Sequence, residues 1–294
     1  MIMDSSRFLI IGANGQLGKA LQHNYPDAMA VDREQLDITD WSAVQQFDWS
    51  RVDVILNAAA YTNVDGAQTT EGRQAAWKIN ASGAGYLSRV AAWQGVTLVH
   101  ISSEYVFDGT QTVHTEDEPF TPLGVYAQAK AAGDIAVMVS PKHFIVRTSW
   151  LIGDGPNFVR TMMNLAERNI SPSVVSDQVG RLTFTSTLVE AIDHLLASQA
   201  QPGTYNVSDD GQPASWADVT RQIFKELGRD DLVVSDTTTA EYFAAKPEAA
   251  PRPLHSVFDL GKIKTSGLAL PDWRDNLSRY IQFESAKPDN HEEQ

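Results

Sequence analysis

A tyrosine and a lysine lie four positions apart in the segment VYAQAK, at Tyr126 and Lys130. If residues 125 to about 139 form a helix, the two side chains share one face and lie one turn apart. A tyrosine has an ordinary pKa of about 10, and a nearby ammonium group lowers it, so that the phenol can pass a proton to a substrate oxygen. The same spacing is common in plain surface helices, so the interpretation depends on the neighbouring segments.

Polar residues follow two apolar runs that are typical of buried strands. VTLVH leads into Ser102, Ser103 and Glu104, and VDVIL leads into residues 57–61, NAAAY. In an open parallel sheet, ligands bind beyond the carboxyl ends of the strands. We therefore expect both segments to meet the tyrosine helix in one crevice. A turn or a helix cap is the alternative interpretation of the serine pair.

Gly12, Gly15 and Gly18 form a G-x-x-G-x-x-G turn between a predicted strand and a predicted helix. Glycines let the backbone approach a pyrophosphate, and the N–H groups at the start of a helix bind it. The spacing departs from the usual G-x-G-x-x-G, and the strand–loop–helix context carries the prediction of a dinucleotide site.

Asp32 ends the next predicted strand and is followed by Arg33. An acid at this point binds the ribose hydroxyls of NAD, whereas an arginine pairs with the 2′-phosphate of NADP. A solvated side chain is the alternative for Arg33. The sequence leaves the coenzyme open as NADPH or NADH, with a slight preference for NADPH.

Strands and helices alternate through the first half of the chain. Strands are expected at residues 7–12, 28–32, 52–59, 96–103 and 143–150, and helices at 15–25, 41–49, 70–95 and after Tyr126. This alternation predicts an α/β fold with a doubly wound parallel Rossmann sheet and helices on both faces.

The regular alternation of strands and helices ends after Trp150. This change predicts a smaller C-terminal α/β substrate lobe. Helices are expected at 157–169, 185–197 and 214–228, and strands at 172–178 and 203–208. Ser215 is the expected N-cap of the last helix, with Asp218 three residues later. The segment 236–256 looks irregular. We expect a dinucleotide-binding domain at 1–150 to which 185–210 returns, a substrate-binding lobe at 151–184 and 211–284, and a flexible tail at 285–294.

Composition excludes several classes of protein. The chain has 294 residues, no cysteine and a formal net charge of −14, which excludes disulfides and thiolate chemistry and disfavours nucleic acid and anionic membranes as partners. No signal peptide or membrane-length apolar run is present, so a cytoplasmic location is expected. HExxH, G-x-S-x-G and Walker patterns are also missing.

Several segments together resemble the extended short-chain dehydrogenase/reductase superfamily, and more closely its dTDP-4-dehydrorhamnose reductase family. They are GANGQLG, LDITD, NAAAYTNVDGA, SSEYVFDG, TPLGVYAQAK, VRTSWLIGDGPNF, SDQVGRLT and LPDWRDNLSRYI. The resemblance runs from about Phe8 to Ile281.

The resemblance implies roles for matching residues. The pyrophosphate would be held by Gly12, Asn14, Gly15, Gln16, Leu17 and Gly18; the adenosine by Asp32, Arg33, Asp37 and Ile38; the rest of the coenzyme by Ala58, Ala59, Tyr61, Ser102, Tyr126 and Lys130. Tyr126 would be the proton donor, Lys130 its partner and Ser103 the hydroxyl that orients the carbonyl. Glu104, Tyr105 and Trp150 would join Ser103 and Tyr126 around the sugar nucleotide.

The implied activity is hydride transfer from NAD(P)H to C4 of dTDP-4-dehydro-L-rhamnose, giving dTDP-L-rhamnose. Two other hypotheses stay open. One is sugar-nucleotide epimerisation or dehydration, which retains or regenerates the coenzyme. The other is a non-catalytic regulatory subunit that binds a dinucleotide and a partner enzyme. Relatives include metal-assisted dimers and monomers, so a monomer and a homodimer both remain open. Mg²⁺ is compatible with the family, but the sequence shows no dedicated magnesium cage.

The chain departs from the family pattern at positions that concern the substrate more than the reaction. Ser103 and Glu104 stand where threonine and aspartate are usual, Gly66 replaces a lysine, and Leu182 replaces a proline. The tryptophans other than Trp150 are predicted to be packing residues; they lie at positions 41, 49, 77, 93, 216 and 273.

Overall fold

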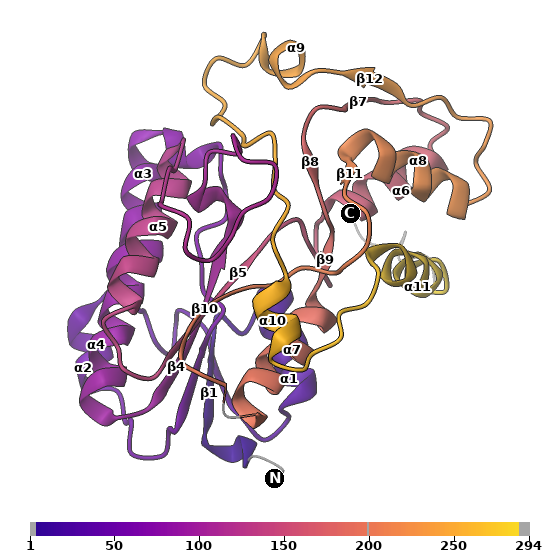
Figure 1. The fold of residues 1–294 in the computed structure, drawn as a ribbon. Coiled ribbons are helices and arrows are strands. Elements are labelled where there is room, and N and C mark those ends of the chain that lie inside the picture. The colour runs from indigo at the N-terminus through magenta and orange to yellow at the C-terminus, as the bar shows by residue number, and fades with distance from the viewer. Residues whose placement is uncertain (1–3, 199, 288–294) are drawn as a thin grey trace.

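The computed structural model describes residues 4–198 and 200–287, and its centre is a six-stranded parallel sheet (Figure 1). In spatial order the strands are β10 (Gly203–Asn206), β5 (His143–Thr148), β4 (Thr97–Ser103), β3 (Val54–Asn57), β1 (Phe8–Ile11) and β2 (Met29–Val31). Because all five neighbouring pairs are parallel, every strand ends at the same edge of the sheet. The predicted doubly wound Rossmann sheet is confirmed.

Five of the six strands of this sheet supply apolar side chains to both faces, whereas β10 supplies Tyr205 to one face. In β1, Phe8 and Ile10 belong to one core cluster, and Leu9 and Ile11 belong to the other. Burial on both faces explains why the strands read as continuous apolar runs in the sequence.

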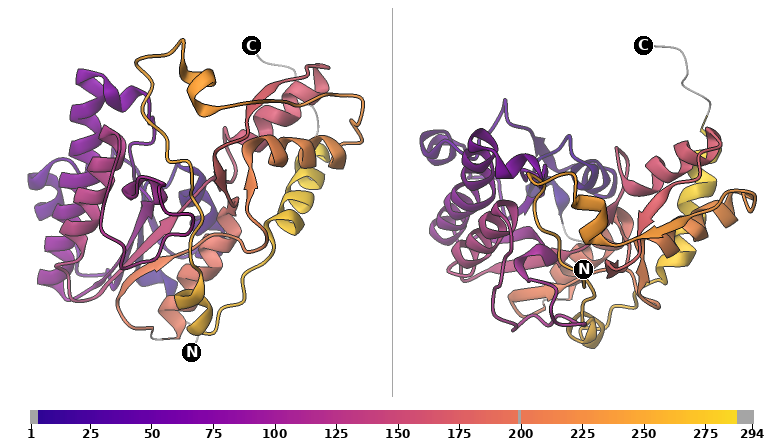
Figure 2. Two further views of the ribbon diagram at one scale, coloured as in Figure 1. Left: turned by 45° about the horizontal axis from the view of Figure 1, so that its top comes forward. Right: turned by 90° about the horizontal axis from the view of Figure 1, so that it is seen from above.

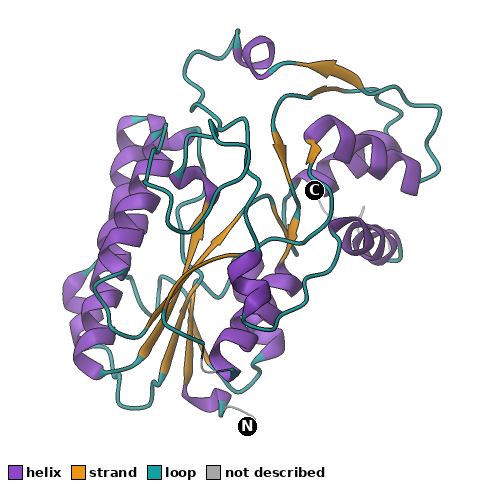
Figure 3. Cartoon of the chain, viewed as in Figure 1, coloured by secondary structure: helices purple, strands orange, loops and turns teal. Residues whose placement is uncertain are grey.

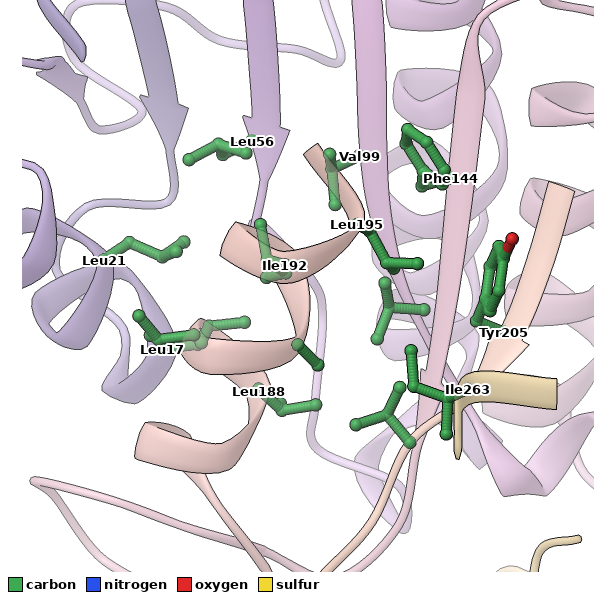
Figure 4. Packing of buried hydrophobic residues seen from close by; sticks show 14 of the residues in the cluster. Leu17, Leu21, Leu56, Val99, Phe144, Leu188, Ile192, Leu195, Tyr205 and Ile263 are labelled. Carbon is green, nitrogen blue, oxygen red and sulfur yellow. The ribbon is translucent and has the colours of Figure 1, made fainter. Parts of the chain in front are cut away.

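Helices cover both faces of the sheet (Figures 1 and 3). One face is covered by α1 (Gln16–Asn24), α7 (Thr185–Ala197) and α10 (Gly261–Thr265). The other is covered by α2 (Trp41–Gln46), α4 (Ala84–Gln94) and α5 (Val125–Val137). Figure 4 shows the first of these cores, in which leucines of α1 and α7 lie against Leu56 and Val99 of the sheet.

The helical stretch predicted at 70–95 contains a feature that the sequence did not indicate. It consists of α3 (Thr70–Ala76), a π-helical turn η3 (Trp77–Gly83) and α4. Within η3, the Asn80 side chain accepts from Tyr61 N–H and donates to Tyr61 C=O, at 2.8 and 3.0 Å. A Cβ at Gly133 of α5 would lie 2.1 Å from Asn80 O, so glycine permits this close helix contact.

The second half of the chain forms a smaller group of elements beside the sheet (Figures 1 and 2). Its helices are α6 (Phe158–Glu167), α8 (Trp216–Glu226), α9 (Thr239–Phe243) and α11 (Trp273–Ser285). Its short strands pair as β6 (Leu151–Ile152) with β9 (Thr183–Phe184), β8 (Val179–Gly180) with β11 (Ala214–Ser215), and β7 (Ser173–Val175) with β12 (Ser235–Thr237). Side chains of α6, α8 and α11 share a separate apolar core.

Local predictions for this half can be compared with the structure. The cap is confirmed: Ser215 and Asp218 form a capping box at α8. The segment 236–256 is less irregular than expected, because it contains the end of β12 and all of α9. Of the predicted flexible tail, residues 288–294 lie outside the described part of the chain. Among residues 4–198 and 200–287 there are also three short 3₁₀ turns: η1 (Ser5–Arg7), η2 (Gly66–Gln68) and η4 (Glu104–Val106).

Candidate active site

The glycine-rich turn brings the backbone of β1, β3 and α1 together. Gly12 has a φ of 82°, and a Cβ there would lie 2.6 Å from Ala59 N. A Cβ at Gly18 would lie 2.1 Å from Gly12 O. Helix α1 begins at Gln16 after Gly15, which has no side chain to cap the helix, so the first N–H groups stay available to an anion. These contacts allow only glycine at both positions.

A cavity of about 240 Å³ extends from this turn along the ends of β1, β2 and β3. Nine of the predicted coenzyme residues line it: Gly12, Asn14, Gly15, Asp32, Arg33, Asp37, Ile38, Ala58 and Ala59. Ala60, from the predicted segment 57–61, also lines it, as do Leu36, Thr39 and Ile79, which were not predicted.

Asp32 and Arg33 take different places at this cavity. Asn14 Nδ2 donates to Asp32 Oδ2 at 2.8 Å, so the carboxylate is held at the glycine turn. The Arg33 side chain is 79% exposed, and its Nε pairs with Asp37 at 3.2 Å. An exposed ion pair of this kind contributes at most about 1 kcal/mol, so a stronger anion can take the guanidinium from Asp37.

A second cavity of about 650 Å³ continues from the first, because Gly15 and Ala58 line both. It is bordered by Gln16, Leu17, Ser102, Ser103, Glu104, Tyr105, Tyr126, Lys130 and Trp150, all of which were predicted site residues. The ends of β4 and β5, the start of α1 and helix α5 therefore meet at one edge of the sheet, as the topology requires.

Two predicted residues do not line either cavity. Gly18 packs behind the turn against Gly12. Tyr61 lies with Ala67, Ala76 and Ala129 in a small apolar cluster that also contacts Tyr126. A direct role of Tyr61 toward a coenzyme therefore stays a prediction.

Tyr126 and Lys130 lie on the same helix, but the lysine is not the main influence on the pKa of the Tyr126 phenol. Lys130 is 2% exposed, and its Nζ donates to Ile101 C=O at 2.6 Å. Burial and then the nearby charge of Glu104 raise the pKa of Tyr126, against a smaller lowering by Ser103. Burial and Glu104 therefore outweigh any lowering by the ammonium, and the expected net lowering of the Tyr126 pKa is wrong for this structure. Burial also lowers the pKa of Lys130 to about 8, opposed by the charge of Asp134.

Ser103 and Glu104 are joined by a buried hydrogen bond. Ser103 Oγ donates to Glu104 Oε2 at 2.7 Å and accepts from Tyr105 N–H at 3.2 Å. Burial raises the pKa of Glu104 to about 7, although Ser103 and two backbone N–H groups lower it. The Tyr105 ring meets the Tyr126 ring edge-on, with centroids 5.7 Å apart.

Trp150 has an unusual backbone and an aromatic partner that sequence reasoning missed. Its φ is 45°, which is rare for a bulky side chain. Its ring stacks on Trp216 with centroids 3.5 Å apart and an interplanar angle of 14°. A Cβ at Gly180 would lie 2.7 Å from the Trp150 ring. Trp216 packs against the core of the smaller half, as predicted, and it also lines the second cavity, which was not predicted.

Two departures from the family pattern have local structural explanations. The Asn63 side chain accepts from Gly66 N–H at 2.8 Å and occupies the space that a Cβ at position 66 would need. Leu182 is fully buried in the core of the smaller half. Beside it, Arg181 donates to the carbonyl oxygens of Gly211 and Phe258, at 2.8 and 3.0 Å.

Within the described residues, no group of three or more acidic or histidine side chains is arranged to hold a metal ion. Over the same residues, none of the helices is both long enough and apolar enough to span a bilayer.

Comparison with known proteins identifies the family. The model of the RmlD substrate binding domain family matches residues 6–285. The chain belongs to this family. It is 36% identical to a dTDP-4-dehydrorhamnose reductase of Aggregatibacter actinomycetemcomitans, over 92% of this chain and 96% of the relative. It is 35% identical to the spore coat polysaccharide biosynthesis protein SpsK of Bacillus subtilis, over 97% and 100%.

Solved structures of related proteins have the same fold as this chain of the RmlD family. The crystal structure of dTDP-4-dehydrorhamnose reductase from Bacillus anthracis in complex with NADP has a TM-score of 0.87 at 36% identity, and covers 96% of this chain and 100% of that one. A reductase structure from Clostridium acetobutylicum has a TM-score of 0.88 at 35% identity, over 95% and 99%.

Proposed function

We propose that this protein uses NAD(P)H to reduce the C4 carbonyl of a nucleotide-linked 4-keto-6-deoxysugar, converting dTDP-4-dehydro-L-rhamnose into dTDP-L-rhamnose. One observation carries the proposal. Tyr126, Lys130 and Ser103 line a cavity that continues into the glycine turn, in a chain of the RmlD family.

The glycine turn and its cavity fit a dinucleotide. Gly12 and Gly18 leave the backbone open where any Cβ would collide, and the start of α1 faces the same space. Gln16 Oε1 is buried and has no hydrogen-bond partner among the described residues. When bound, the coenzyme supplies the hydride; the chain supplies its orientation and the proton.

Tyr126 carries a proton at neutral pH that can pass to the oxygen that becomes negative as the carbonyl is reduced. The raised pKa also makes the phenol a weaker acid, so the transfer depends on a positive charge that stabilises the phenolate. Lys130, mostly protonated at pH 7, places a positive charge at the base of the same cavity. That charge stabilises the phenolate left after proton transfer.

We expect both coenzymes to be used, with a preference for NADPH. Arg33 stands at the rim of the first cavity and is held only by its exposed pair with Asp37. A 2′-phosphate is a doubly charged acceptor that an arginine binds in preference to a single carboxylate. Asp32, held by Asn14, remains in place for the ribose hydroxyls of NADH.

The test is a coupled assay. The keto-sugar is made in situ from dTDP-glucose by dehydration and epimerisation, and oxidation of NADPH and NADH is followed separately. We expect oxidation that requires the sugar, and a loss of at least about 100-fold in Tyr126→Phe, which lacks the transferable proton. Full turnover by Tyr126→Phe would contradict the mechanism.

Two other outcomes would redirect the assignment. Conversion of a sugar nucleotide without net NAD(P)H consumption would favour an epimerase or a dehydratase. No conversion of any keto-sugar, together with dinucleotide binding and a stoichiometric partner protein, would favour a regulatory subunit.

A further inference from the structure

The hydroxyl proton of Ser103 has two competing acceptors. A serine hydroxyl donates one hydrogen bond and accepts up to two. In this structure the proton is given to Glu104 Oε2 at 2.7 Å. The proposed reaction needs the same proton at the substrate carbonyl. An ionised Glu104 accepts this proton and so prevents Ser103 from donating to the carbonyl.

A protonated Glu104 removes the conflict. Its O–H then donates to Ser103 Oγ across the same short contact, and Tyr105 N–H continues to donate to that oxygen at 3.2 Å. Both acceptor sites of the hydroxyl are then filled by protein groups. The serine proton is then available to the substrate oxygen and to the Tyr126 oxygen, on which Ser103 already acts.

From this geometry, and resting on the proposed function, we infer that Glu104 is a positioning residue that must be protonated in the reactive state, where it turns the Ser103 hydroxyl toward the substrate carbonyl. Glu104 forms no bond to the reacting atoms in this role. No covalent bond changes at Glu104, and the proton that reaches the product comes from Tyr126.

The surroundings of Glu104 favour the neutral form. Glu104 is 5% exposed, and the groups facing it are Ser103 from β4, Tyr105 from η4 and Tyr126 from α5, none of them cationic. A carboxylate buried without a cation is costly, and protonation relieves that cost.

The two nearby cationic side chains form hydrogen bonds with groups other than Glu104. Lys130 donates to Ile101 C=O, and Arg252 donates to Asp65 Oδ1 and to Ala250 C=O. Consistent with these surroundings, burial brings the pKa of Glu104 to about 7. The carboxyl group therefore changes its protonation within the physiological pH range.

The test compares the pH dependence of kcat/KM for the wild type and Glu104→Gln, between pH 6 and pH 8. The active form is the protonated one, so activity is present below the pKa of Glu104 and is lost as the pH rises through it. With a pKa of about 7, the wild type loses about tenfold from this group over that range. In Glu104→Gln the amide donates to Ser103 at every pH, so only the roughly twofold fall from Lys130, with its pKa of about 8, remains.

A second readout does not depend on turnover. Infrared difference spectra of the wild type with bound coenzyme should show the carbonyl band of a protonated carboxyl group, which disappears as the pH rises through about 7 and is missing in Glu104→Gln. Glu104→Asp keeps a carboxyl group and should keep both the band and the steep pH dependence.

The outcomes separate this inference from the proposed function. Equal pH profiles for the wild type and Glu104→Gln, with no titrating band in the wild type, overturn the inference and leave the reductase assignment standing. Absence of keto-sugar reduction by the wild type at every pH overturns the proposed function, and the inference falls with it, whatever the infrared titration shows.

Discussion

The stacked pair Trp150 and Trp216 allows a quantitative prediction for Trp216→Ala. A left-handed backbone costs a residue other than glycine about 1–2 kcal/mol, and Trp150 adopts it with a φ of 45°. An aromatic contact contributes about 0.5–1.5 kcal/mol beyond the area it buries, and the two rings lie 3.5 Å apart. The stack is thus large enough to offset most of the backbone cost.

Removing Trp216 should free Trp150 to leave this position. If a loss of about 1.4 kcal/mol falls on substrate binding, KM for the keto-sugar rises about tenfold. The value of kcat should change little, because Tyr126, Lys130 and Ser103 are untouched. Trp77→Phe is the matched control, since Trp77 is an exposed indole on the π-helical turn.

The measurements are steady-state kinetics and circular dichroism. Two indoles in close stacking couple electronically and give a paired positive and negative band. Trp216→Ala should remove the contribution of the Trp150 pair and keep that of Trp41 and Trp93, whose centroids lie 5.6 Å apart, whereas Trp77→Phe should keep both. An unchanged KM in a Trp216→Ala protein that has lost the contribution of the Trp150 pair would refute the reasoning, because Trp150 would then hold its place without its partner.

Two further predictions concern coenzyme binding and stability. Gly18→Ala should weaken NADPH binding beyond detection in a fluorescence titration, because its Cβ would lie 2.1 Å from Gly12 O; a dissociation constant like that of the wild type would show that the turn adapts. Asp134→Ala should lower the free energy of unfolding by about 3–5 kcal/mol in urea, since it leaves Arg147, 1% exposed, without its carboxylate; a loss below about 1 kcal/mol would mean that water reaches the guanidinium.

The sequence predicted those parts of the molecule that follow from local patterns. The run FLII is apolar at every position because both faces of β1 are buried, and the turn at Gly12 and Gly18 follows from the lack of room for a Cβ. Topology then places the ends of parallel strands together, which brings Ser103 to Tyr126 without any knowledge of side-chain contacts.

What the sequence could not predict depends on contacts between distant segments. Trp216 looked like a core residue because nothing near it indicates that Trp150 lies against it. The phenol pKa was misjudged because helical spacing shows that Lys130 is near Tyr126, but not that Ile101 C=O binds its ammonium or that Glu104 contributes a charge. The π-helical turn carries no recognised sequence signal.

The position of β10 at the edge of the sheet has a consequence for biosynthesis. Strand β10 pairs with β5, and helix α7, which precedes β10, packs beside α1 on the same face of the sheet. Both β10 and α7 are translated after α6 and β7–β9. A nascent chain that has reached residue 150 therefore exposes the open edge of β5 and an uncovered apolar surface. At about 5–20 residues per second, the ribosome needs several more seconds to synthesise α7 and β10. We expect this interval to be when the chain depends most on chaperones.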